Sequence, residues 1–204
     1  MTMPRSWPAL LPLLALLAAP APGEDPAALK PQGYVSDFAR VLDRSARAAL
    51  EDYCARVEQA TGAQIALVTI HSLDGQPVEQ FAGQLFRQWG LGSKSKNEGV
   101  LVLLAIQDRR SRVEVGYGLE PVIPDGFAGA VLRSMRDSLR AGDYASALQE
   151  AARTLGETVA REKKVEIGGA PLPRRRPARK DEDAVWGPLV TAVSLILFLI
   201  FIAE

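Results

Sequence analysis

Residues 97–117 have the sequence NEGVLVLLAIQDRRSRVEVGY, in which an apolar run precedes a short polar turn and an alternating segment. The run at 100–106 is apolar throughout, which is typical of a strand buried on both faces of a sheet. The segment at 111–117 alternates polar and apolar residues, which is typical of a strand with one covered face. Because the turn between them is short, the two strands are predicted to form an antiparallel hairpin.

Amphipathic helices are predicted on both sides of this hairpin along the chain. Asp43 is a suitable N-cap for a helix with apolar residues at helical spacing over 46–60, and Gly62 is suited to end it. A second apolar, β-branched strand follows at 63–70, and a second helix begins at Pro77 and ends at 90–92. Two more helices are predicted over 127–140 and 144–164, with Asp143 as the N-cap of the last. This order predicts an α/β protein, a three-layer α/β/α sandwich with a mixed sheet.

Apolar segments flank this domain at both ends of the chain. Residues 1–23 combine Arg5, a short apolar run and small residues, which predicts a secretory signal peptide. Cleavage is expected after Gly23, with cleavage after Ala21 or an uncleaved anchor as the alternatives. Residues 185–203 carry no charge and predict a transmembrane helix. Between the two lie a loose leader (24–32), the globular domain (33–165) and a Pro/Arg-rich linker (166–184).

The layout predicts an exported protein whose domain lies outside the cytoplasm, on the periplasmic or extracellular face, and is held to the membrane by the C-terminal helix. A basic run just before that helix conflicts with this orientation, because such residues favour the cytoplasmic side. The run consists of Arg174, Arg175, Arg176, Arg179 and Lys180. Export is preferred because the first hydrophobic segment usually decides orientation. The alternatives are a tail-anchored domain facing the cytoplasm, and contact of the basic run with anionic lipid headgroups.

Composition excludes several classes of function. The chain has 24 basic and 24 acidic residues among 204, so it lacks the positive charge of a nucleic-acid binder. Its single cysteine, Cys54, rules out an internal disulfide and is expected to be a buried thiol on the apolar side of a helix. His71 is the one histidine, whereas zinc sites generally use several His or Cys ligands.

Acidic residues gather in the predicted loops rather than on helix faces. They are Asp37, Asp108, Glu120 and Asp125. In open α/β sheets ligands bind beyond the strand ends, and carboxylates that meet there suit a hard cation such as calcium or magnesium. Asp is also common in turns, and Asp125 is placed to cap a helix, so a structural role for each residue is the alternative.

No complete catalytic constellation is visible in the sequence. The chain has no Gly-x-Ser-x-Gly elbow, no phosphate-binding loop and no dinucleotide fingerprint. A Ser-His-Asp arrangement is left open by the residues themselves. Arginine suits a phosphoryl group, so Arg109, Arg110 or Arg112 is a candidate for holding one, with solvated turn and strand residues as the alternative.

Five motifs in order along the chain resemble the signatures of the TPM domain. They are SDFARVL at 36–42, TGAQIA at 61–66, WGLG at 89–92, NEGVLVL at 97–103 and DRRSRVEVGYGLE at 108–120. The likeness covers about residues 33–160, and members of the family typically have a signal peptide before this domain and a membrane helix after it. Pro121 and Gly126 depart from the small residue and the alanine that are usual at these positions.

The resemblance implies an α/β/α fold with a divalent-ion groove at one end of the sheet. It transfers the metal-ligand role to Asp37, Asp108, Glu120 and Asp125, with calcium as the first choice of ion and magnesium as the second. Plant thylakoid relatives are described as acid phosphatases linked to photosystem repair, and an animal relative as a receptor accessory protein. The family therefore does not fix one activity.

Two functions are expected from these features. The first is a non-catalytic, membrane-tethered module that binds a divalent cation and assists or binds another envelope protein. The alternative is a metal-assisted hydrolase of phosphomonoesters, similar to an acid phosphatase, in which the cation activates water. The first is preferred because no residue set completes a catalytic site. The sequence does not determine the oligomeric state.

Overall fold

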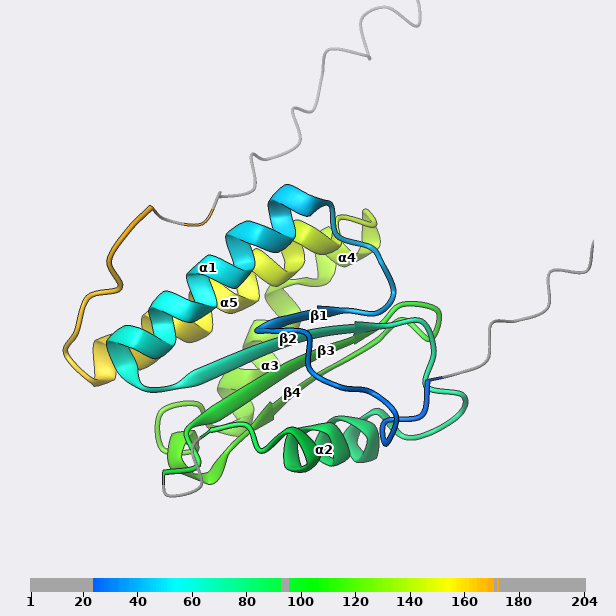
Figure 1. Ribbon diagram of the computed structural model, residues 1–204, viewed down its shortest axis with the longest axis horizontal. Coiled ribbons are helices and arrows are strands. Elements are labelled where there is room, and N and C mark those ends of the chain that lie inside the picture. Colours follow the sequence, from blue (N-terminus) through cyan, green and yellow to red (C-terminus); the bar gives the residue numbers. More distant parts are fainter. Residues whose placement is uncertain (1–23, 93–95, 171, 173–204) are drawn as a thin grey trace, which may run out of the picture.

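The computed structural model describes residues 24–92, 96–170 and 172 of the chain. They form one mixed sheet with helices on both faces (Figure 1). The elements in order are β1 (Val35–Asp37), α1 (Arg44–Thr61), β2 (Gln64–Ile70), α2 (Val78–Trp89), β3 (Gly99–Ala105), β4 (Arg110–Val115), the 3-10 turn η1 (Tyr117–Leu119), α3 (Asp125–Ser134), α4 (Arg136–Arg140) and α5 (Tyr144–Glu162).

The strands lie in the order β1-β2-β3-β4, which is also their order in the sequence. β1, β2 and β3 are parallel, and β4 is antiparallel to β3, with Val102 opposite Val113. The predicted hairpin is therefore confirmed. The carboxyl ends of the three parallel strands share one edge of the sheet, which we call the carboxyl edge. The opposite edge, where β2 and β3 begin and β4 ends, is the amino edge.

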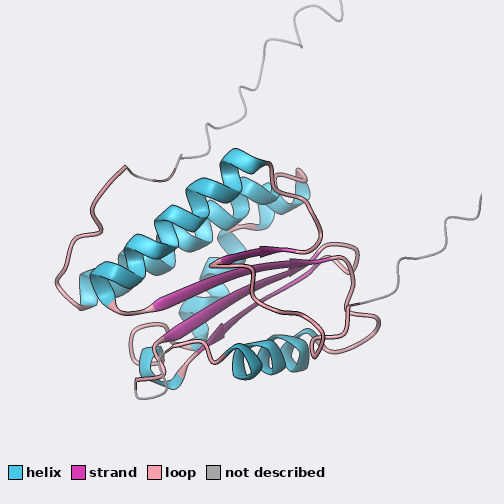
Figure 2. Cartoon of the chain, in the orientation of Figure 1, coloured by secondary structure: helices cyan, strands magenta, loops and turns pink. Residues whose placement is uncertain are grey.

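Alternate residues of the central strands enter two separate apolar cores, one on each face of the sheet. In β3, Val100, Val102 and Leu104 pack in the first core, together with residues of α1, α3 and α5. Leu101, Leu103 and Ala105 pack in the second core, under α2. Figure 2 shows the helices on both sides of the strands. The three-layer α/β/α sandwich with a mixed sheet is thus the observed fold.

The ends of α1 follow from its capping residues. The Asp43 carboxylate accepts a hydrogen bond from Ala46 N at 2.8 Å, as an N-cap does. Gly62 adopts φ 74°, and its N–H donates to the Glu58 carbonyl at 2.7 Å, so the helix stops where glycine permits the left-handed conformation. The predicted N-cap and C-terminal glycine are both confirmed.

One predicted helix needs correction, and one observed strand is additional to the prediction. The helix predicted over 127–140 is two helices, α3 and α4, which meet at Met135. β1 was not predicted, because three residues are too short to show a periodic pattern. Its backbone is instead held by Glu51 of α1, whose carboxylate accepts hydrogen bonds from Tyr34 N at 2.9 Å and Val35 N at 2.7 Å.

The leader predicted to be loose is packed against α2 along the described part of the chain. Leu29 is buried in the second core, and the Trp89 indole donates to its carbonyl at 3.0 Å. The Glu24 carboxylate accepts hydrogen bonds from His71 N at 2.9 Å and Ser72 N at 3.1 Å, just after β2. The leader thus helps α2 to cover the second core.

The start of the predicted linker also contacts the domain. The Arg56 guanidinium of α1 donates to the carbonyls of Gly168 at 2.9 Å and Ala170 at 2.8 Å. Leu172 is buried in the first core. The predicted signal peptide, the rest of the predicted linker and the predicted transmembrane helix lie outside the described residues. Within those residues, no helix combines the length and hydropathy required to span a membrane.

Candidate functional site

The sheet divides the four predicted carboxylates between its two edges. Asp37 ends β1 and Asp108 follows β3, so both lie at the carboxyl edge. Glu120 and Asp125 follow β4, which runs back to the amino edge. A seven-residue strand such as β3 separates the edges by about 20 Å. The expected convergence of all four side chains in one groove is therefore not found.

Asp37 is buried and its carboxylate is surrounded by protein donors. The residue is 8% exposed, Oδ1 accepts a hydrogen bond from Val41 N at 3.1 Å, and Oδ2 accepts one from Leu42 N at 3.0 Å. The Thr69 hydroxyl of β2 also donates to Oδ1. These contacts tie the loop after β1 to the neighbouring strand, which is a structural role.

The other three carboxylates have fewer contacts. Asp108 is half-buried, and its Oδ2 accepts a hydrogen bond from Leu73 N at 2.8 Å, which joins the β3–β4 turn to the loop after β2. Glu120 and Asp125 are exposed, and Asp125 is the first residue of α3. Among residues 24–92, 96–170 and 172, no three His, Cys, Asp or Glu side chains form a group that could hold a metal ion. The predicted residues thus do not fit one shared cation site, and calcium or magnesium binding stays a prediction.

Asp37→Asn is expected to lower the free energy of unfolding by about 1–3 kcal/mol, because the amide cannot accept from all three donors. Asp125→Asn is the control: it removes the same charge at an exposed position and should cost less than about 1 kcal/mol. Urea unfolding of the full chain measures both. We expect the same loss in calcium, in magnesium and in chelator. A loss that appears only with the cation present would instead make Asp37 a metal ligand.

The carboxyl edge carries a different feature, a cavity of about 840 Å³. It lies where β3 ends and β4 begins, and α4 and the start of α5 close its other side. Four arginines line it: Arg109, Arg110, Arg136 and Arg140. Apolar residues, among them Leu104, Leu132 and Leu139, form the rest of its lining, together with Tyr144 and Ser111. We call this the arginine cavity.

Three of the four arginines of the arginine cavity have no ion-pair partner within the described chain. No ion pair or side-chain hydrogen bond is formed there by Arg109, Arg110 or Arg136 with another described residue. Arg140 lies 3.7 Å from Asp137, but both side chains are about four-fifths exposed, so this pair is weak. The described lining contains no carboxylate. A cavity with an apolar lining and several guanidinium groups suits an anionic group attached to an apolar body.

Sequence reasoning identified half of this cluster. Arg109 and Arg110 are candidate phosphate ligands in the sequence, and both line the cavity. Arg112, the third candidate, is instead paired with Glu114 on β4 at 3.2 Å. Arg136 and Arg140 were missed because they lie in the segment predicted as one continuous helix. Their spacing of four residues on a helix was the available signal, since it places both on one face.

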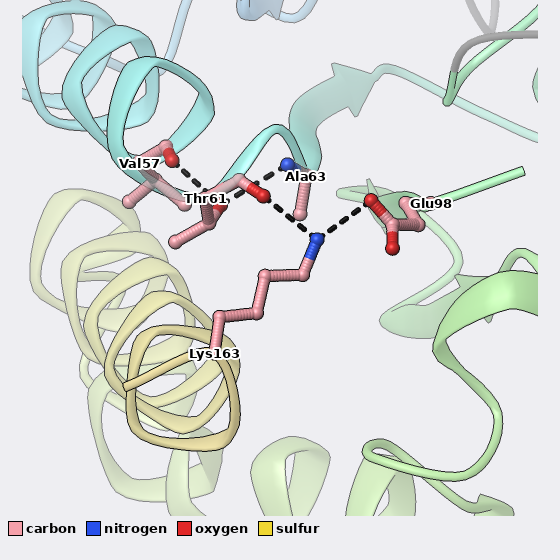
Figure 3. Close-up of polar contacts among 5 residues, drawn as sticks. All are labelled: Val57, Thr61, Ala63, Glu98 and Lys163. Atoms are coloured by element: carbon pink, nitrogen blue, oxygen red, sulfur yellow. Dashed lines mark hydrogen bonds and ion pairs between the residues drawn. The ribbon is translucent and has the colours of Figure 1, made fainter. Parts of the chain in front are cut away.

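The amino edge is held by a polar cluster that Figure 3 shows. Lys163, just after α5, donates from Nζ to Glu98 Oε2 at 2.6 Å and to the Thr61 carbonyl at 2.7 Å. The Thr61 hydroxyl in turn donates to the Val57 carbonyl at 2.6 Å and accepts from Ala63 N at 3.0 Å. These bonds join the ends of α1 and α5 to the segment before β3. The cluster satisfies its own polar groups, so we assign it to the fold rather than to a ligand.

Two further candidates for chemistry lie outside the arginine cavity. Cys54 is fully buried in α1, and burial raises the pKa of its thiol well above the usual range, so the predicted inert thiol is confirmed. The backbone N–H of His71 donates to Glu24, and this residue follows β2 without lining the cavity. Neither residue offers a nucleophile or a base to a ligand bound among the arginines.

Solved structures of bacterial proteins are similar to this chain. The N-terminal domain of a Porphyromonas gingivalis protein is 29% identical, with a TM-score of 0.60 over 67% of this chain and 88% of that one. The BA42 protein of Bizionia argentinensis is 18% identical, with a TM-score of 0.53 over 67% and 91% of the two chains. The N-terminal domain of a Corynebacterium glutamicum protein is 16% identical, with a TM-score of 0.52 over 76% and 96%. The B. argentinensis and C. glutamicum proteins, at 18% and 16% identity, show likeness of fold alone.

The family of the chain follows from its sequence match. No curated protein matches it. The TPM domain matches residues 35–158, which is more than half of the chain, and spans β1 to most of α5. The resemblance predicted from the five motifs is thereby confirmed, and this chain belongs to the TPM domain family.

Proposed function

We propose that the chain is a binding module that recognises an anionic group of a partner protein in the arginine cavity. The observation that carries this proposal is the set of three guanidinium groups without ion pairs in the described structure, beside a cavity of about 840 Å³. The carboxyl edge of a parallel sheet is also the usual place of ligand binding in α/β proteins.

Binding is preferred to hydrolysis because of what lines the cavity. The arginines could hold a phosphoryl group, and Ser111 and Tyr144 supply hydroxyls. However, the described lining has no His, Cys, Asp or Glu to serve as general base, general acid or metal ligand. The metal-assisted phosphatase therefore stays the alternative, and the predicted cation takes no part in the proposal.

The place of action is proposed from the two ends of the sequence. A signal peptide at 1–23 would export the domain, and a membrane helix at 185–203 would hold it on the outer side of the membrane. The partner is then another envelope or membrane protein with an accessible acidic segment or chain end.

The test compares recognition with hydrolysis in the full chain. Fluorescent acidic peptides are expected to bind, and added salt should weaken the binding, because the contacts are between exposed charges. Arg136→Glu should lower the affinity at least about tenfold. Arg133→Glu makes the same change at an exposed position of α3 outside the cavity and is the matched control.

Two results would contradict the proposal. Equal affinities of the Arg136→Glu and Arg133→Glu chains for acidic peptides would remove the arginine cavity as the site. Hydrolysis of p-nitrophenyl phosphate that is lost in Arg136→Glu and retained in Arg133→Glu would favour the phosphatase.

A further inference from the structure

We infer that the arginine cavity receives the C-terminal carboxylate of an extended polypeptide, which adds to the free edge of β4 as an antiparallel strand. This inference rests on the proposed function and goes further, because it names the partner's chemical group, its conformation and its direction. It depends on three observations: the direction in which the β4 backbone groups point, the covering of the β4 faces, and the position of the arginines at the start of β4.

β4 is the last strand of the sheet and presents unpaired backbone groups on its outer side. Val115 lies opposite Val100, and the N–H of the next residue, Gly116, donates to the Gly99 carbonyl at 2.8 Å. In an antiparallel pair, hydrogen-bonded and non-hydrogen-bonded pairs alternate along the strands. Ser111, Val113 and Val115 are therefore the residues whose N–H and C=O groups point away from β3.

No hydrogen bond within the described chain reaches those outer groups from another segment. β4 lies at the side of the sheet opposite β1 (Figure 1). Its two faces are covered, since α2 and α3 both contact it. The outer side of β4, along its length, is therefore open, while packing of α2 and α3 fixes the two faces of the strand. An extended peptide can bind such an edge through main-chain hydrogen bonds, without a large rearrangement.

Charge decides the direction of the added strand. β4 begins at Arg110, directly beside the arginine cavity. An antiparallel partner ends beside Arg110, so its terminal carboxylate lies at the positively charged cavity that Arg109, Arg110 and Arg136 line. A parallel partner would begin there and bring its terminal ammonium to the same positive cavity, which is unfavourable.

The apolar part of the cavity predicts the character of the last side chains. Val113 packs in the first core, on the face of the sheet that α3 covers. Leu132 of α3 and Leu139 of α4 line the cavity on that same face and are partly buried in the first core. Every second side chain of the partner faces this surface, because side chains alternate along a strand. We therefore expect an apolar residue at or next to the partner's C-terminus.

The experiment uses the full chain and labelled peptides with an apolar last residue. Each peptide is made with a free C-terminal carboxylate and with a C-terminal amide. We expect amidation to weaken binding at least tenfold, and Arg110→Gln to weaken binding of the free-acid peptide to a similar extent. Arg133→Gln, outside the cavity, should leave both affinities unchanged.

A second measurement tests strand addition without altering the protein. Single N-methyl groups are placed in turn on successive peptide amides near the C-terminus. An added strand forms ladder hydrogen bonds with alternate amides, so every second methyl group should abolish binding while the others are tolerated. A peptide held by its carboxylate alone would show no such alternation.

Each other outcome overturns the inference in a recognisable way. Equal binding of amidated and free-acid acidic peptides, still lost in Arg136→Glu, would keep the proposed function and reject the terminal carboxylate. Failure of all anionic peptides to bind would reject both. Binding only of vesicles that contain phosphatidylserine would assign the cavity to lipid headgroups. A dimer in solution that excludes peptide would assign the β4 edge to a second copy of the chain.

Discussion

Gly116→Ala is expected to lower the free energy of unfolding by about 3 kcal/mol or more, although it adds a single methyl group. Gly116 has φ −72° and ψ 148°, which any residue can adopt, so the expected loss is steric. The new Cβ would lie 2.2 Å from the Asn97 carbonyl oxygen and 3.1 Å from Cζ of Phe86. A backbone oxygen cannot turn aside as a side chain does, so the end of β4 or the segment before β3 would have to move.

Urea unfolding followed by tryptophan fluorescence measures this loss in the full chain. Gly126→Ala is the matched control, because no atom lies within 4 Å of its added Cβ and the residue is in the first turn of α3. This control should stabilise the protein by about 0.5–1 kcal/mol, since alanine favours a helix over glycine. A Gly116→Ala chain within about 1 kcal/mol of the parent would mean that the close approach of the two backbones is wrong.

The same steric requirement explains why several TPM motifs contain glycine. An added Cβ at Gly92 would lie 2.4 Å from Gly99 N, and one at Gly118 would lie 2.0 Å from the Lys96 carbonyl oxygen. These glycines come from the WGLG, NEGV and GYGLE segments, which meet at the amino edge. The glycines of the family motifs at the amino edge are therefore required for close backbone packing. They do not by themselves locate a binding site.

Local patterns were sufficient to predict most of the fold. The buried run of β3 and the alternation in β4 identify a hairpin, because both patterns are set by which faces are covered. The caps of α1 are equally local, since Asp43 bonds a backbone N–H three residues away. β1 could not be predicted in this way, because Glu51 of α1 holds its start through hydrogen bonds to residues 16 and 17 positions earlier in the chain.

Whether the four carboxylates could share one site depends on the edge of the sheet at which each loop lies. The predicted hairpin is sufficient to place Glu120 and Asp125 at the amino edge, since an antiparallel strand after β3 returns the chain to that edge. Those residues could therefore not meet Asp37 and Asp108. The arginine cavity was harder to predict, because it requires the β3–β4 turn and α4 to lie together. The break at Met135 and the packing of α4 against α5 are tertiary features without a local signal.

Phe81→Ala is expected to lower the free energy of unfolding by about 3–5 kcal/mol, which is the usual range for a buried phenylalanine. Phe81 is fully buried in the second core, on the inner face of α2. Gln84→Ala, at an exposed position of the same helix, is the control and should change stability by less than about 0.5 kcal/mol. Chemical denaturation with circular dichroism detection measures both variants.

The large effect at Phe81 follows from how unequally the two faces of the sheet are covered. The first core is shared by α1, α3 and α5. The loss of one side chain there leaves the contacts of the other two helices in place. In the described chain, α2 is the one helix that contributes to the second core, with Leu29 of the leader beside it. Removal of the Phe81 ring thus weakens both the helix and the leader that packs on it. A loss below about 1 kcal/mol would show that α2 contributes little to the stability of the sheet, and would also undermine the fixed β4 face on which strand addition depends.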